Sequence, residues 1–412
     1  MHQSFAFLRR RPRHVVAAVA ALAAGGLLAG TSYAGATASD STGSPSPSSS
    51  RTKLPSSAEV WQVAEAPYAE NRSNPLADRV WGVYQGPQDQ VSGPYLATTG
   101  VRHDLLAKIA LRPRTKWYGA FVPDTSIRSS VRSYIASSQN GDPDKLVQIA
   151  VFRMTPWEGA ACKRRSTLPE KRSYKRWINE LAAGIGDTPM LVVMQPDMPF
   201  LWCTPDRGEK SKLLTYATKT LSALSRTSVY IDAGAADWCE NGKGNDARRC
   251  AGLLIRAGVE YARGFALDST HYAGPADNIR HGVAINAALR GAGYDSKHFI
   301  IDTAKSGRPM LWKDVIPAGK KDLKDNARVC KTVTQTRCVT LGIPPTTRVA
   351  DPVWGLTTEE RAIGRQYVDG FVWVGRPWLV NQASPFSASR AMTMAMSTPW
   401  PGPVVLPTLP PL

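Results

Sequence analysis

The chain has 412 residues, of which 43% are hydrophobic and 20% are charged. These fractions are typical of globular proteins and exclude a chain that is disordered throughout. Lys and Arg number 51 against 33 Asp and Glu, so the formal net charge is +18. The basic residues are scattered and accompany no nucleic-acid-binding motif, so we expect a basic, solvated surface and no nucleic-acid partner.

The ends of the chain differ in composition from its middle. Residues 1–38 have the pattern of an export signal, with an arginine-rich start, an apolar stretch over 15–28 and a small-x-small cleavage site at Ala36-Thr37-Ala38. The apolar stretch is short for a membrane span, so we expect a secreted, extracellular protein without membrane contact after signal removal. The other segments are expected to be a Ser/Thr/Pro-rich linker (39–57), a catalytic barrel (58–400) and a proline-rich tail (401–412).

From about Trp61 onward, short apolar runs alternate with amphipathic helical stretches. The pattern predicts strands at 81–84, 117–121, 146–152, 190–194, 228–232, 263–267, 298–302 and 370–374. It predicts helices at 105–110, 127–136, 169–182, from Thr204-Pro205 onward, and at 249–263, 277–292, 358–366 and 392–396. Such alternation indicates parallel βαβ units. The expected fold class is therefore α/β, a distorted parallel (β/α) barrel of seven to eight strands, with a doubly wound open sheet as the alternative.

The stretch Met190–Cys203 carries the first candidate for chemistry. Its apolar run reads as a strand buried on both faces, and Pro196 ends that strand because proline cannot donate to a sheet ladder. Asp197 then lies just past the carboxyl end of the strand, among apolar and aromatic neighbours. Such neighbours raise the pKa of a carboxyl, and a raised pKa suits a general acid. The alternative is that Asp197 only caps the following helix.

Other carboxylates also follow strand ends. Besides Asp197, these are Glu158, Asp232, Asp268 and Asp302. Carboxylates gathered at the carboxyl edge of a barrel favour acid/base chemistry on sugars, although each could instead cap a helix or form an ion pair. The chain has 12 tryptophans, which could stack on sugar rings or lie in the core. The six histidines are dispersed, so we expect no metal centre and no cofactor.

The even number of cysteines in an exported chain favours disulfides. Proximity suggests Cys239–Cys250 and Cys330–Cys338, which leaves Cys162–Cys203. A zinc site is the rival interpretation, but no CxxC or HxxxH spacing supports it.

Several motifs resemble those of glycoside hydrolase family 6, the secreted, inverting β-1,4-endoglucanases and cellobiohydrolases. They are YKRWINELAAGIGDTPMLVVMQPD (Tyr174–Asp197), VYIDAGAADW (Val229–Trp238), RGFALDSTHY (Arg263–Tyr272) and FIIDTAKSG (Phe299–Gly307). The resemblance runs from about Asn74 to Val374. It implies a distorted barrel of parallel strands with a substrate cleft or tunnel over their carboxyl ends.

The resemblance also implies roles for individual residues. Asp197 falls on the general acid of the family's Glu-Pro-Asp motif, here Gln-Pro-Asp, and Asp232 falls on a carboxylate that shapes the site. Glu158 falls where the family has an Asp that raises the pKa of the acid. Five residues are the candidates for substrate binding: Trp117, Trp238, His271, Lys305 and Arg376. Lys305 replaces a family arginine, and Arg376 takes the place of a family lysine. The resemblance is also compatible with a Cys162–Cys203 pair.

One departure from the family concerns the catalytic base. The family's Lys-Pro-Gly-Gly-Glu-x-Asp after the last strand is replaced here by Gly375 to Asn381, and Asn381 cannot accept a proton. The base is therefore unassigned, with Asp232 or a water chain ending on Glu158 as candidates.

The leading hypothesis is a monomeric, secreted glycoside hydrolase that cleaves β-1,4-glucan with inversion. The alternative is a catalytically impaired carbohydrate-binding protein on the same barrel. A basic cell-wall-associated protein that acts through its charge is a third interpretation, which salt-sensitive binding would favour.

Overall fold

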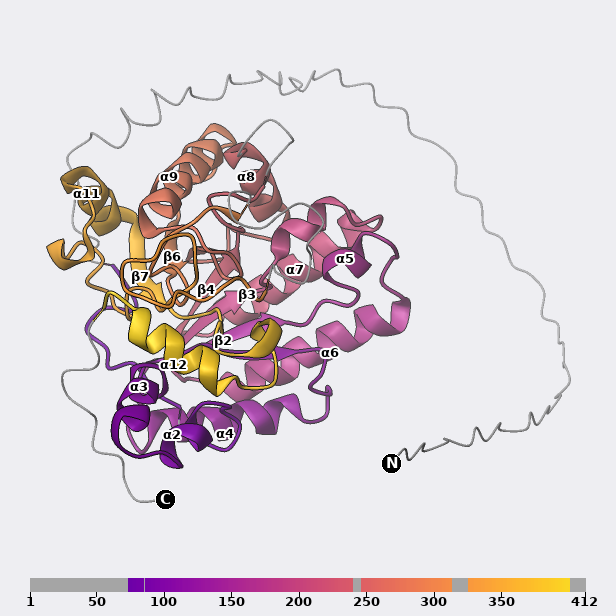
Figure 1. Cartoon of the computed structure of the whole chain (residues 1–412). Helices are drawn as coiled ribbons and strands as arrows, with labels where there is room; N and C mark the ends of the chain where they lie inside the picture. Colours follow the sequence, from indigo (N-terminus) through magenta and orange to yellow (C-terminus); the bar gives the residue numbers. More distant parts are fainter. Residues whose placement is uncertain (1–72, 85, 240–245, 313–324, 401–412) are drawn as a thin grey trace, which may run out of the picture. The chain divides into compact units, whose positions relative to one another are not determined.

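The structure is a computed structural model that describes residues 73–84, 86–239, 246–312 and 325–400 (Figure 1). The predicted signal, linker and tail, and the first residues of the predicted barrel, lie outside these ranges. None of the helices within the ranges is both long and apolar enough to span a bilayer.

The described residues contain one seven-stranded sheet in which every strand runs parallel to its neighbours (Figure 1). The strands are β1 (Lys116–Gly119), β2 (Val147–Phe152), β3 (Met190–Met194), β4 (Thr227–Asp232), β5 (Gly264–Leu267), β6 (His298–Asp302) and β7 (Val368–Val372). Their spatial order is the order of the sequence. The predicted first strand, 81–84, is wrong: Trp81 makes only an isolated bridge to Leu146 beside β2.

The sheet curls until its first and last strands approach each other. The backbone N–H of Thr115, just before β1, donates to the carbonyl of Trp373, just after β7, over 2.9 Å. The indole N–H of Trp117 in β1 donates to the carbonyl of Val374 over 2.8 Å. These bonds join the two edges of the sheet, so the fold is the predicted distorted barrel and not the open alternative.

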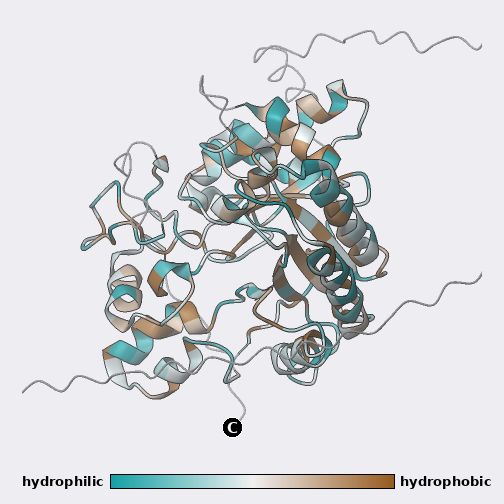
Figure 2. Cartoon of the chain, turned by 90° about the vertical axis from the view of Figure 1, so that its right-hand side faces the viewer, coloured by the Kyte–Doolittle hydropathy of each residue, from teal (hydrophilic) through white to brown (hydrophobic). Residues whose placement is uncertain are grey.

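Both faces of the strands are buried, which explains why β3 reads as an unbroken apolar run. Leu191 and Val193 of β3 belong to the apolar cluster inside the barrel. Met190, Val192 and Met194 alternate with them and face the layer of helices outside. Figure 2 shows this arrangement as hydrophobic strands, with helices whose colours mix hydrophilic and hydrophobic residues.

The helices follow the strands in the expected alternation. They are α2 (Ser92–Leu96), α3 (Gly100–Ala110), α4 (Ile127–Gln139), α5 (Glu158–Ala161), α6 (Leu168–Ile185), α7 (Arg207–Ser222), α8 (Ala247–Arg256), α9 (Pro275–Gly291), α11 (Thr358–Tyr367) and α12 (Ala388–Ser397). Short 3₁₀ turns are η1 (Met198–Trp202), η3 (Pro352–Trp354) and η4 (Val380–Gln382). Helix α6 begins where Thr167 and Glu170 form a reciprocal capping box, a strong start signal.

Several predicted helix boundaries differ from the structure, and two of the differences have a clear local reason. Helix α7 begins at Arg207 and not at Thr204-Pro205, because the preceding residue Asp206 has φ −112° and ψ 39°, which are not helical. Helix α8 ends at Arg256, earlier than the predicted 263. Gly258 follows with φ 82°, a left-handed conformation that ends helices and favours glycine.

The six cysteines form three disulfides, which are the expected pairs Cys162–Cys203, Cys239–Cys250 and Cys330–Cys338. The zinc interpretation is therefore wrong, since no thiolate remains as a ligand.

Candidate active site

A cavity of about 750 Å³ opens beyond the carboxyl ends of the central strands. Four carboxylates line it: Glu158 after β2, Asp197 after β3, Asp237 after β4, and Asp325 between β6 and β7. Aromatic side chains form other parts of its wall, among them Trp238 and His271. Carboxylates and aromatic rings at the carboxyl edge of a parallel barrel are the arrangement expected for sugar chemistry.

Asp197 stands at the tight turn between β3 and η1, with φ 64°. Its side chain does not cap the following turn. Instead, its Oδ1 accepts a hydrogen bond of 2.9 Å from the Thr270 hydroxyl, on the segment after β5. The helix-cap alternative is therefore wrong, and the carboxyl points into the cavity.

The pKa of Asp197 is raised well above its ordinary value. The largest cause is burial, which disfavours the charged form, and the next causes are the negative charges of Asp232, Glu158 and Asp325. The hydrogen bond from Thr270 acts in the opposite direction but does not outweigh them. A carboxyl in these surroundings keeps its proton to higher pH than an ordinary aspartic acid, which suits a general acid.

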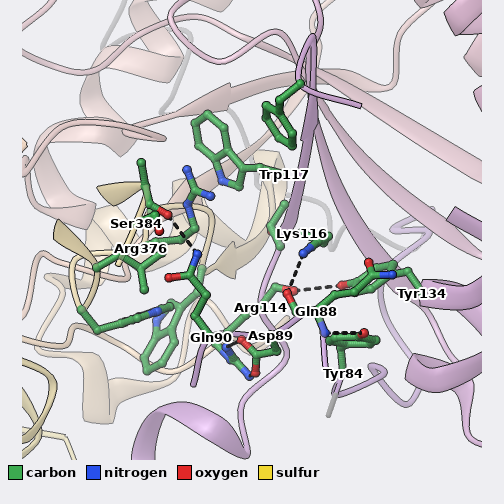
Figure 3. Close-up of a pocket in the computed structure, with 17 residues that line it drawn as sticks. Tyr84, Gln88, Asp89, Gln90, Arg114, Lys116, Trp117, Tyr134, Arg376 and Ser384 are labelled. Carbon is green, nitrogen blue, oxygen red and sulfur yellow. Dashed lines mark hydrogen bonds and ion pairs between the residues drawn. The ribbon is translucent and has the colours of Figure 1, made fainter. Parts of the chain in front are cut away.

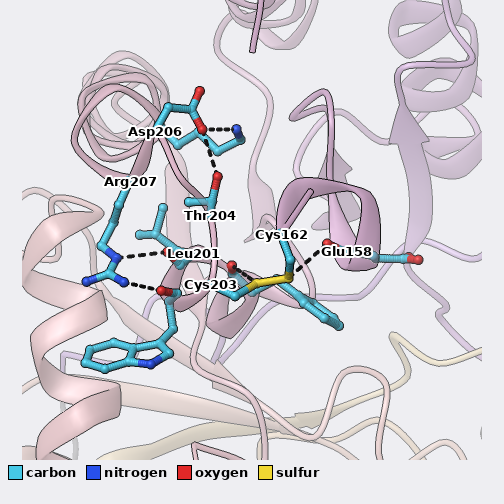
Figure 4. The surroundings of a disulfide bond; sticks show 10 residues. Glu158, Cys162, Leu201, Cys203, Thr204, Asp206 and Arg207 are labelled. Carbon is cyan, nitrogen blue, oxygen red and sulfur yellow. Dashed lines mark hydrogen bonds and ion pairs between the residues drawn. A yellow bond between two sulfur atoms is a disulfide. The ribbon is translucent and has the colours of Figure 1, made fainter. Parts of the chain in front are cut away.

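The Cys162–Cys203 disulfide lies close to Glu158 (Figure 4). It couples the segment that carries Glu158 to the segment that carries Asp197. Glu158 is the first residue of α5, and Cys162 caps that helix at its end. Asp197 precedes η1, and Cys203 caps that turn at its end. The disulfide therefore joins the C-terminal ends of α5 and η1, and the carboxylates at the N-terminal ends of both turns line one cavity. Partial burial and the charge of Asp325 raise the pKa of Glu158.

Asp232 lies behind the cavity and not in its lining. It ends β4, is 1% exposed, and accepts from the backbone N–H of Gly234 over 3.1 Å. Burial raises its pKa to about 7. Asp232 is therefore outside the lining of the cavity, and its ionised form raises the pKa of Asp197.

An aromatic wall is built around His271. Its ring stacks on Trp238, with centroids 4.8 Å apart and planes 12° from parallel, and it also contacts Trp312 at 4.4 Å. Asp237 orients this wall, because one of its oxygens lies 2.9 Å from His271 Nδ1 and the other accepts from the backbone N–H of Trp312 at 2.6 Å. These contacts lower the pKa of Asp237 despite its burial. Trp238 is half-buried, so part of its surface remains available to a ligand.

Trp117 and Arg376 line a different cavity of about 370 Å³ (Figure 3). The guanidinium of Arg376 lies 4.5 Å from the centre of the Trp117 ring, and burial lowers the pKa of Arg376 to about 10. Phe152 approaches the same ring at 5.5 Å. Among the described residues, the linings of the two cavities have no member in common. Trp117 and Arg376 therefore do not line the cavity that holds Asp197, Glu158, Trp238 and His271.

Lys305 lies in the barrel wall with 1% exposure. Its ammonium pairs with Asp302 at 2.9 Å and donates to the carbonyls of Asp268 and Ser269 at 3.1 Å. Asp302 and Asp268 are equally buried, and their oxygens accept from loop backbone N–H groups. These two strand-end carboxylates hold loops in place, and we leave Lys305 out of the proposed substrate contacts.

Asp237, Thr270 and Asp325 are among the cavity residues that were not candidates from sequence. Asp237 and Thr270 lie within two of the motifs quoted above, VYIDAGAADW and RGFALDSTHY, so closer attention to those motifs could have found them. Asp325 lies in a polar stretch without a motif, 23 residues beyond Asp302, so no sequence signal marked it. The described residues contain no cluster of His, Cys, Asp or Glu suited to a metal ion.

Comparison with known proteins places this geometry in a family. Residues 90–378, more than half of the chain, match the model of the glycosyl hydrolases family 6. Endoglucanase A of Cellulomonas fimi is 31% identical over 242 residues, which are 58% of this chain and 50% of that protein. Endoglucanase 1 of Streptomyces halstedii is 26% identical over 219 residues, or 52% of this chain and 65% of the relative. The chain thus matches about half to two thirds of the length of these relatives.

Solved structures agree with the fold. The endoglucanase Cel6 from Mycobacterium tuberculosis, in complex with a methyl cellobiosyl-4-deoxy-4-thio-β-D-cellobioside, superimposes with a TM-score of 0.59 at 22% identity. The match covers 78% of this chain and 98% of that one. A family 6 enzyme from Orpinomyces sp. Y102 gives a TM-score of 0.56 at 17% identity, over 79% and 98% of the two chains. The chain belongs to the glycosyl hydrolases family 6.

Proposed function

We propose that the protein is a secreted glycoside hydrolase that cleaves β-1,4-linked glucan with inversion at the anomeric carbon. The observation that carries this proposal is the carboxyl of Asp197, which lies in an aromatic-walled cavity with its pKa raised by burial and by neighbouring carboxylates. Family membership supports the reaction class. The relatives named endoglucanases, and the one bound to a thio-linked cello-oligosaccharide, support the choice of glucan.

In this mechanism, Asp197 donates its proton to the glycosidic oxygen as the bond to the anomeric carbon breaks. Thr270 holds the carboxyl in position through its bond to Oδ1. The half-buried Trp238, fixed by His271 and Asp237, offers a face on which a glucosyl ring can stack. Water then attacks from the opposite side of the ring, which inverts the anomeric configuration.

We further propose that the protein acts outside the cell as a monomer on a polysaccharide. The three disulfides support an oxidising compartment. The proposed division into signal (1–38), linker (39–57), catalytic barrel (58–400) and tail (401–412) rests on the sequence pattern.

The test is reducing-sugar release by the secreted protein from a panel of β-glucans, with the anomer of the first product followed by NMR. We expect release from β-1,4-glucan, with the α-anomer appearing first. Retention of the β-anomer would contradict inversion. Binding to the glucans without any release would contradict the hydrolase and favour the impaired carbohydrate-binding protein.

A second expectation concerns pH. The charge of Glu158 raises the pKa of Asp197, so Glu158→Gln lowers that pKa. A general acid works only while it is protonated, and kcat/KM falls as pH rises through its pKa. The alkaline limb of the pH profile should therefore move to lower pH in Glu158→Gln.

The matched control is Glu180→Gln, which removes an equal charge from the surface of α6, where Glu180 pairs with Arg128. This variant should keep the alkaline limb of the unmodified protein. An unshifted limb in Glu158→Gln would contradict the coupling between Glu158 and Asp197.

A further inference from the structure

An inverting site needs a second carboxylate that takes a proton from the attacking water. The segment after β7, where the resemblance to the family would place this base, offers the amides Asn381 and Gln382 instead. Asp232, one of the two candidates from sequence, is buried behind the cavity. The proposed function is therefore incomplete without a base from elsewhere in the fold.

We propose that Asp325 is the catalytic base, supplied by the segment between β6 and β7. Its side chain lines the same cavity as Asp197 and is exposed, so solvent reaches the carboxylate. Asp197 follows β3, in the middle part of the strand order, whereas Asp325 comes between β6 and β7, near its end. The acid and the base thus reach the cavity from separate parts of the curled sheet, and attack opposite the leaving group requires two carboxyl groups on separate sides of the sugar.

The other carboxylates of the cavity fit the role less well. Asp197 holds its proton and is the acid. Both oxygens of Asp237 are engaged, by His271 and by the backbone N–H of Trp312. Glu158 follows β2, beside β3, and the disulfide ties it to the segment of Asp197, so it approaches from the same side as the acid. The negative charge of Asp325 raises the pKa of both Asp197 and Glu158, which places all three within one electrostatic site.

The segment after β7, which has amides where the family motif has carboxylates, contacts Asp325 and its neighbours. The side-chain amide of Gln382, which is 8% exposed, donates to Asp325 Oδ1 over 3.3 Å. The neighbouring asparagines bond to each other, and the backbone N–H of Asn381 donates to the side-chain oxygen of Asn326 over 2.9 Å. Arg390 of α12 donates to the carbonyl of Ala327 over 2.9 Å.

These contacts fix the backbone on which Asp325 stands. Among the described residues, Gln382 alone hydrogen-bonds to the Asp325 carboxylate, which leaves Oδ2 for water. The amides after β7 thus act as positioning residues. They stand where the family motif has a carboxylate, and they hold the carboxylate of Asp325, which comes from another loop.

The reaction balances with these two groups. The water oxygen forms a bond to the anomeric carbon while the bond from that carbon to the glycosidic oxygen breaks. The electron pair of the broken bond stays on the glycosidic oxygen, which takes the proton of Asp197. One proton of the water passes to Asp325. Proton exchange with solvent then returns Asp197 to its acid form and Asp325 to its carboxylate.

The experiment compares Asp325→Asn with Asp295→Asn in the full chain. Asp295 is exposed on the connection from α9 to β6, at the opposite edge of the sheet, so its replacement removes the same charge without touching the cavity. We expect Asp325→Asn to lower kcat on β-1,4-glucan by about 10²- to 10⁴-fold with little change in KM, and Asp295→Asn to remain fully active.

A second variant distinguishes chemistry from structure. Asp325→Ala leaves room for a small anion, so added sodium azide should restore turnover and yield an α-glycosyl azide. Activity of Asp325→Asn within a few-fold of the unmodified protein, or a loss that azide does not restore in Asp325→Ala, would overturn the assignment. If the unmodified protein releases no sugar, the proposed function fails, and with it the need for a base.

Discussion

Replacement of Asp197 by Asn is expected to lower kcat on β-1,4-glucan by about 10²- to 10⁴-fold while KM changes little. The amide keeps the size of the side chain and can still accept from Thr270, but it has no proton to give to the leaving oxygen. The loss therefore falls on the chemical step and not on binding. Steady-state kinetics with a soluble β-1,4-glucan would measure it.

The nature of the leaving group separates an acid from a base. A 2,4-dinitrophenyl β-cellobioside departs without protonation, so Asp197→Asn should recover most of its activity on this substrate. Asp325→Asn should not recover, because water still needs a base. Equal losses on glucan and on the aryl glycoside in Asp197→Asn would contradict its role as the acid.

The parts of the fold that sequence predicts well are those in which local pattern and tertiary environment agree. Strand β3 is an unbroken apolar run because the barrel interior covers one face and helices cover the other. Helix α6 has both an apolar stripe and a complete capping box. The predicted strand at 81–84 fails because only one bridge to Leu146 is formed there, although its apolar residues are similar to those of true strands. A pattern of four residues does not distinguish a strand from an extended segment packed on a sheet.

The sequence predicts those residues of the site that come soon after the end of a strand. Asp197 and Glu158 come soon after strands β3 and β2, so the parallel topology alone brings them to one edge. Lys305 shows the limit of this argument, since it also follows a strand end but its ammonium is turned into the wall by Asp302. Asp325 is the opposite case, a residue of the cavity that no strand end marks in the sequence. Its place in the cavity depends on contacts with Gln382 and with Arg390 through Ala327, between segments more than fifty residues apart. No local sequence pattern predicts such contacts.

Replacement of Asp369 by Ala is expected to lower the stability of the fold strongly. This carboxylate in β7 is fully buried and accepts two bonds from Arg263, at 2.8 and 2.9 Å, and one from the Tyr230 hydroxyl at 2.6 Å. The network thus joins β7 to β4 and to the residue that precedes β5. Asp369→Ala leaves the Arg263 guanidinium, whose side chain is 20% exposed, without its carboxylate. It should lower the free energy of unfolding by about 3 kcal/mol, the lower end of the range for a broken buried pair. Denaturant unfolding followed by tryptophan fluorescence would measure it.

A double-mutant cycle shows why the loss should be so large. Most of the lost stability comes from the unpaired charge that is left behind and not from the attraction that is lost. The attraction within a buried ion pair only slightly exceeds the cost of removing its two charges from water. The double variant Asp369→Ala/Arg263→Leu should therefore be more stable than Asp369→Ala alone. Lys212→Ala, which breaks an exposed pair with Glu209 on α7, should leave the unfolding midpoint unchanged. If the double variant loses the sum of the two single effects, the buried charge is not the cause, and the network contributes through packing alone.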